Sequence, residues 1–250
     1  MIGIYDLDTC NNLGFQERLQ IYKDCGFLEI ALYLDERYNK TGENYEDIIN
    51  EARKLNLKIK QVHIDYKISN KICDNTTNEY FDYVSKKLNE AKKFNIPYVV
   101  AHASMSDEPP KIDDKQIEKF KDMMKNVQGV TLCLENVRNN FNLKKLLDLN
   151  LDNVKMCYDL GHAHCYGNEK TIFEEFKNHI ICSHLHDNIG KDTHFCLGDG
   201  EIDYKEIIEK LSKKENSSNC LECFPEYGKV LSKEEFVDFV KKCFDTIKNF

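Results

Sequence analysis

The sequence contains no tryptophan, only four prolines and only four arginines among its 250 residues. No segment approaches the roughly eighteen consecutive apolar residues of a membrane span, so we expect no membrane partner. No secretory signal precedes the first apparent strand, which predicts a cytoplasmic protein. No linker-like stretch or charge-run tail divides the chain, so we expect one domain over residues 1–250.

The chain also lacks any excess of positive charge. It carries 35 basic and 43 acidic residues, which gives a formal net charge of −8. A general basic surface for a polyanion is therefore excluded, and nucleic acid is a disfavoured partner. A local groove can still be basic on an acidic protein, so nucleic acid binding stays open at this point.

Cysteine is abundant instead, with eleven residues. In a chain with no secretory signal these are expected to be reduced thiols, several of them packed inside apolar strands. Cys220 and Cys223 have Cys-x-x-Cys spacing, but a strand would point their sulfurs to opposite faces, which argues against a redox or zinc motif.

Short apolar runs alternate with segments of helical periodicity along the whole chain. The expected strands are Ile2–Asp6, Phe27–Leu34, Lys58–Ile64, Ile96–Ala103, Val130–Val137, Val154–Leu160, a strand beginning at Ile180, and Asn219–Phe224. The expected helices are Phe15–Cys25, Tyr45–Leu55, Asn78–Phe94, Asp113–Val127, Leu143–Leu149, Glu169–Lys177, Tyr204–Leu211 and a last one capped by Ser232. Eight strand–helix units predict an α/β fold, the (β/α)8 TIM barrel, over a doubly wound open sheet, because no glycine-rich phosphate loop follows the first strand.

Metal-capable side chains stand where the last six of these strands end, the edge at which a parallel barrel keeps its chemistry. They are His63, His102, Glu135, Asp159, His162, His184, His186, Asp192, His194 and Glu222. Taken singly, each is more often a structural residue than a functional one. Glu135 and Glu222 change this balance, because burying a carboxylate in an apolar strand costs several kcal/mol unless a cation compensates it. None of the four arginines lies in the last four strands, so a divalent metal ion is the simplest compensating charge.

The same residues resemble the xylose isomerase-like barrel superfamily, which includes sugar isomerases, ketose 3-epimerases, inosose-processing enzymes and the endonuclease IV branch of DNA repair. The resemblance rests on Glu-Asn at 135–136, Asp-x-Gly-His at 159–162, His-Leu-His-Asp-Asn at 184–188, Asp-x-His at 192–194 with Leu-Gly-Asp-Gly-Glu-Ile-Asp after it, and Glu222. Single motifs are weak, but their order on consecutive strands is specific.

The resemblance implies a role for each matching position. The ligands of the shared metal site are Glu135, Asp159, His184 and Glu222. In the epimerase branch the two glutamates also act as catalytic acid and base, and His162 contacts substrate. The positions matching the further ligands of the three-zinc endonuclease branch are His63, His102, His162, Asp192 and His194, and Tyr66 matches an aromatic found there. His186 is expected to orient a ligand or touch substrate, and Tyr66 is a further candidate substrate contact.

Two classes of enzyme follow from the resemblance. The first, which we favour, is an isomerase or epimerase of a small sugar, sugar phosphate or polyol ketone, with a divalent ion (Zn, Mn, Mg or Co) stabilising an enediolate. The second is a zinc phosphodiesterase acting on abasic DNA, against which stand the charge of −8 and the lack of a long basic or aromatic-rich loop. We expect one ion, with two or three possible: a second ion in the first class would allow a hydride shift instead, and the second class would use three zinc ions. A barrel that has lost catalysis is less consistent with the presence of both glutamates, and homo-oligomerisation stays open.

Overall fold

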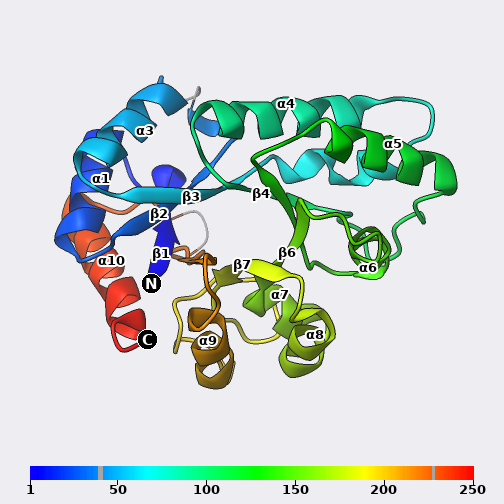
Figure 1. Cartoon of the computed structure of the whole chain (residues 1–250). Helices are drawn as coiled ribbons and strands as arrows, with labels where there is room; N and C mark the ends of the chain where they lie inside the picture. Colours follow the sequence, from blue (N-terminus) through cyan, green and yellow to red (C-terminus); the bar gives the residue numbers. More distant parts are fainter. Residues whose placement is uncertain (39–41, 227–228) are drawn as a thin grey trace.

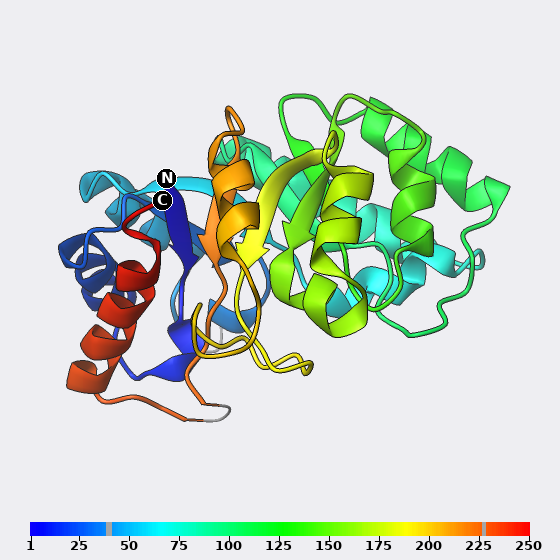
Figure 2. The same ribbon diagram turned by 90° about the horizontal axis from the view of Figure 1, so that it is seen from below.

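The computed structural model describes residues 1–38, 42–226 and 229–250. Eight parallel strands pair in chain order and close into a barrel, because β1 pairs with both β2 and β8. The helices surround this barrel, and the two ends of the chain lie near each other (Figures 1 and 2). The predicted (β/α)8 barrel is confirmed.

The strand bounds are β1 Ile2–Tyr5, β2 Glu29–Tyr33, β3 Lys58–His63, β4 Tyr98–His102, β5 Thr131–Glu135, β6 Val154–Asp159, β7 Ile180–Leu185 and β8 Ser218–Leu221. The helices are α1 Phe15–Asp24, α3 Tyr45–Lys54, α4 Glu79–Lys93, α5 Asp114–Lys125, α6 Phe141–Leu147, α7 Leu160–Tyr166, α8 Glu169–Phe176, α9 Lys205–Ser212 and α10 Lys233–Ile247. Two 3-10 helices, η1 Asp8–Cys10 and η2 Tyr66–Cys73, follow β1 and β3. No helix in the described ranges has the length and apolar character needed to cross a bilayer.

Helix α7, like the two 3-10 helices, was not predicted by the sequence analysis. It begins where we expected the sixth strand to continue to Leu160, because the carboxylate of Asp159 turns back and accepts a hydrogen bond from the His162 amide at 2.6 Å. The segment holds a glycine and two histidines, which are weak helix formers, so its pattern is that of a loop. This cap fixes Asp159 and His162 beside each other at the barrel mouth.

The strand register brings the functional residues to one level. His102 of β4 is paired with Glu135 of β5, and Asp159 of β6 is paired with His184 of β7. The strand arrows of Figure 2 point toward the end of the barrel at which the β7–α9 loop, in yellow, and the segment after β8, in orange, both lie. Because parallel strands all end at the same rim, residues distant in sequence meet there.

Candidate metal centre at the barrel mouth

The core of the centre is a single imidazole surrounded by three carboxylates. His184 Nδ1 lies 3.2 Å from Glu135 Oε2, 3.2 Å from Glu222 Oε2 and 3.7 Å from Asp159 Oδ2. All three acids are buried: the exposed fraction is 1% for Glu135, 7% for Glu222 and 0% for Asp159. Such a concentration of buried negative charge needs a compensating cation.

The opposite side of the His184 ring is held by two residues deeper in the barrel. Its Nε2 lies 2.9 Å from the Tyr5 hydroxyl and 3.2 Å from the Oε1 atom of Gln61. Because an amide oxygen can only accept, the ring proton belongs on Nε2. With the Nε2 proton held in this way, Nδ1 is the nitrogen left to bind a metal ion between the three carboxylates.

The donor set fits a divalent metal ion. Asp159 Oδ2 and His184 Nδ1 are buried and have no hydrogen-bond partner among the described residues. Within the same part of the chain, no lysine or arginine forms an ion pair with Glu135, Asp159 or Glu222. An ion held by these four side chains would supply both the missing partner and the missing charge.

A second group of possible ligands lies on the β3–β5 side and shares Glu135. His63 Nε2 is 3.1 Å and His102 Nε2 is 3.4 Å from Glu135 Oε2. The ligand atoms of these three residues lie within 4.8 Å of one another. The exposed ring of Tyr66, at the start of η2, stacks over His102 with the ring centroids 6.4 Å apart.

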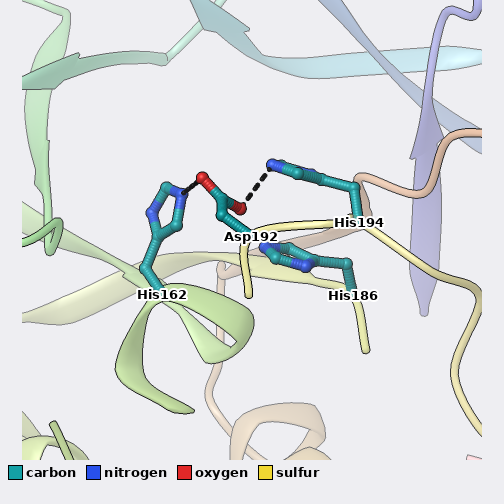
Figure 3. A group of neighbouring side chains, drawn as sticks. All are labelled: His162, His186, Asp192 and His194. Carbon is teal, nitrogen blue, oxygen red and sulfur yellow. Dashed lines mark ion pairs between the residues drawn. The ribbon is translucent and has the colours of Figure 1, made fainter. Parts of the chain in front are cut away.

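A third group is centred on Asp192 in the β7–α9 loop (Figure 3). Its carboxylate bridges His162 Nε2 at 3.4 Å and His194 Nε2 at 3.1 Å, while the ring of His186 stacks on that of His194. His162 also reaches the first group, because its Nδ1 lies 3.0 Å from Glu135 Oε1. The three groups therefore form one continuous cluster.

The charges in this cluster shift one another's protonation. Burial alone would raise the pKa of Glu135 and of Glu222, but the histidines around them, His184 foremost, lower both. Burial lowers the pKa of His194, but the hydrogen bond with Asp192 overrides it and raises this pKa to about 9. Both glutamates are thus carboxylates at neutral pH, as a ligand or a general base must be.

Comparison with known proteins places this arrangement in a family. Residues 19–243 match the family described as xylose isomerase-like TIM barrel. The chain belongs to this family.

Two curated relatives and two solved structures illustrate how far the similarity reaches. The probable endonuclease 4 of Mycoplasma capricolum is 27% identical over 221 residues, which is 76% of each chain. The uncharacterized protein MJ1311 of Methanocaldococcus jannaschii is 36% identical over 75 residues, but this match spans only 28% of this chain and 26% of that protein. The D-psicose 3-epimerase of Clostridium cellulolyticum H10 superposes with a TM-score of 0.73 at 16% identity, covering 99% of this chain and 98% of that one. The IOLI protein with a bound zinc atom gives 0.76 at 18% identity, covering 100% and 98%. The solved structures share the fold.

In this xylose isomerase-like barrel, the residues singled out from the sequence all lie at one mouth. The cavity of about 940 Å³ there is lined by several of them together with residues of β2 and η2. Its lining includes Tyr33, Arg37, His63, Tyr66, His102, Glu135, His162, Asp192, His194 and Glu222. Asp159, His184 and His186 are fully buried beside it. Their assignment as ligands or substrate contacts remains a prediction.

The sequence analysis missed the residues that support this centre from β1, β2 and β3. Tyr33 donates a hydrogen bond to Glu222 Oε1 at 2.8 Å, and the guanidinium of Arg37 stacks on the Tyr33 ring at 3.4 Å. Tyr5 and Gln61 hold His184 as described above. A search for metal-capable side chains passes over tyrosine and glutamine. The available signal was position, since Tyr5 and Tyr33 each end a strand.

Proposed function

We propose that the protein is a divalent-metal-dependent isomerase or epimerase of a small ketose, sugar phosphate or polyol ketone. The observation that carries this proposal is the placement of Glu135 and Glu222 in the lining of one cavity. Glu135 ends β5 and Glu222 directly follows β8, and each approaches His184 Nδ1 to 3.2 Å. A cavity of about 940 Å³ is of the size that small-molecule sites have.

The metal would be held by Glu135, Asp159, His184 and Glu222. A divalent ion bound there supplies Lewis acidity, which makes the proton beside a carbonyl more acidic and stabilises the resulting enediolate. The class of ion, whether Zn, Mn, Mg or Co, follows from a borderline set of one imidazole and three carboxylates, which accepts each of them.

The protein's own contribution is proton transfer by the two glutamates. One carboxylate takes the proton from the carbon next to the carbonyl, and the other returns a proton to the opposite face or the neighbouring carbon. Tyr33 engages Oε1 of Glu222 and His162 contacts Oε1 of Glu135, so in both residues Oε2 is the oxygen that faces His184. These contacts orient each carboxylate for its task.

Proton transfer is tested by solvent exchange. The metal-loaded protein, incubated in deuterium oxide with a panel of ketoses and their phosphates, should introduce deuterium next to the carbonyl, as read by NMR. Glu135→Gln and Glu222→Gln should each abolish this uptake. Glu29→Gln is the matched control, because Glu29 is equally buried but lies at the opposite end of the barrel, at the start of β2, and should keep the exchange.

A second function, hydrolysis of a phosphodiester at abasic DNA, is favoured by one specific observation. Two groups of ligand atoms share Glu135 and a third reaches it through His162, and multinuclear zinc sites commonly cleave phosphodiesters. The relative named probable endonuclease 4 is consistent with this chemistry. The net charge of −8 argues against a DNA footprint.

Incision of an abasic duplex after addition of zinc, with an undamaged duplex as control, tests this second function. Metal analysis of the purified protein separates the two, since one ion per chain supports the first function and three ions support the second. Incision without deuterium uptake into any ketose would replace the first proposal by the second.

A further inference from the structure

Three buried thiols meet behind the loop that carries Asp192 and His194. Cys196 lies in that loop, Cys223 follows β8, and Cys243 is on α10. Their sulfur atoms lie within 4.8 Å of one another, and those of Cys196 and Cys243 are 3.1 Å apart. All three residues are at most 1% exposed.

These cysteines differ from those inside the barrel. The barrel cysteines stand on consecutive strands, and the layered packing of the barrel interior brings their side chains together, as for Cys133 of β5 and Cys182 of β7, whose sulfurs are 3.5 Å apart. The other three come from three separate segments, and their sulfurs nevertheless converge on one point. Cysteine that merely fills core space does not require this convergence, and a disulfide would use two sulfurs and leave the third without a role.

The spacing suits one metal ion. Metal–sulfur bonds of about 2.3 Å place sulfurs on the same ion roughly 4 Å apart, a separation that these side chains reach by small rotations. Three thiolates and a divalent ion carry one net negative charge. The ammonium of Lys242, which is 2.7 Å from Asp199 Oδ1, is close enough to interact electrostatically with both Cys196 and Cys243.

We propose that Cys196, Cys223 and Cys243 form a second metal site, a three-thiolate site for a soft divalent ion of the zinc group. Thiolates select such ions, whereas the imidazole and carboxylates at the barrel mouth also accept harder ones, so the two sites differ in preference. Binding converts each thiol to a thiolate and releases its proton.

The site would tie the β7–α9 loop to β8 and α10. The loop already meets the segment after β8 through the Phe224 amide, which donates to the His194 carbonyl at 2.8 Å. An ion on Cys196 and Cys223 would brace this same junction from behind. The proposal is independent of the function assigned to the barrel mouth, because it uses none of that centre's ligands.

Cadmium-113 is the probe, because its chemical shift separates sulfur from nitrogen and oxygen ligands. Adding it to the reduced full-length protein should give a sulfur-to-cadmium absorption band that saturates at one equivalent, with a resonance in the thiolate range. Cys196→Ser, Cys223→Ser and Cys243→Ser should each remove both signals. Cys182→Ser and Cys157→Ser, which remove buried thiols inside the barrel, should keep them.

Three results would overturn the proposal. The first is the lack of any thiolate resonance in the wild type, a result that stands even where a serine variant fails to fold. The second is loss of the signals only in Cys157→Ser, which would assign the sulfur to the barrel mouth. The third is a Cys196–Cys243 disulfide in the purified protein, seen by mass spectrometry without reduction.

Discussion

Replacing Gly161 by alanine should destabilise the protein through a single collision with His186. An ideal Cβ at position 161 would lie 1.9 Å from Cε1 of His186 and 2.3 and 2.4 Å from its two nitrogens. Carbon atoms in contact settle near 3.5 Å, so the ring must retreat by about 1.5 Å.

The ring has no free space into which it can move. His186 is fully buried, stacks on His194 with centroids 3.8 Å apart, and has its Nε2 3.1 Å from Asp159 Oδ1. Overpacking of this kind costs about 1–3 kcal/mol, and a rigid ring held on several sides should lie at the upper end. Gly161 is in α7, where alanine is intrinsically favoured by about 1 kcal/mol, so any loss of stability reports the collision.

Urea unfolding in the presence of a chelator measures this cost without interference from metal binding. Gly14→Ala is the matched control, because Gly14 has φ −67° and the nearest atom to an added Cβ is 3.5 Å away. It should change the free energy of unfolding by less than about 1 kcal/mol.

A double-mutant cycle identifies the partner. In the His186→Ala background the Gly161→Ala substitution should become neutral or stabilising, because the ring it collides with has been removed. An equal loss of stability in both backgrounds would show that the position of His186 described here is wrong.

Two further predictions concern Gln61, which contacts His184, and Asp8, which lies in η1. Gln61→Leu removes an acceptor that holds the Nε2 proton of His184. The metal Kd, measured by titration calorimetry, should therefore rise about 10- to 100-fold. An unchanged Kd would contradict the orientation assigned to the His184 ring. Burial raises the pKa of Asp8 from 3.8 to about 7, so its ionisation should remove up to about 4 kcal/mol of wild-type stability as the pH rises from about 4 through 7. The Asp8→Asn variant stays neutral, so it should unfold at a higher temperature than the wild type at about pH 8 and lose this advantage below about pH 4. A constant difference in Tm between the two proteins across this pH range would refute the prediction.

The barrel and the residues at its mouth could be predicted because both depend on local patterns. Strand–helix alternation determines the topology, and the end of each strand determines which side chain reaches the rim. Glu135 and Glu222 stood out because a carboxylate is costly inside an apolar strand. None of this required knowledge of which strands are neighbours across the cavity.

The contacts that support the centre could not be predicted in the same way. Tyr5 meets His184, 179 positions away, and Tyr33 meets Glu222, 189 positions away. These pairs depend on the stagger between strands in the closed barrel, which the sequence pattern leaves undetermined. The same holds for the cysteines. The Cys-x-x-Cys spacing suggested Cys220 and Cys223 as a pair, but these two residues pack in different clusters. The sulfur of Cys223 lies instead beside those of Cys196 and Cys243.

Glu135 links the number of ions to the reaction. Its Oε2 lies within 3.4 Å of His63, His102 and His184, and its Oε1 lies 3.0 Å from His162. If Glu135, Asp159, His184 and Glu222 held one ion, Glu135 could still take a proton. If the neighbouring groups held ions as well, Glu135 would serve as a ligand to more than one of them and would lose its capacity to act as a base. On the two proposed functions, the same side chains would favour proton transfer at low metal occupancy and phosphodiester hydrolysis at full occupancy, and the metal content would select between them.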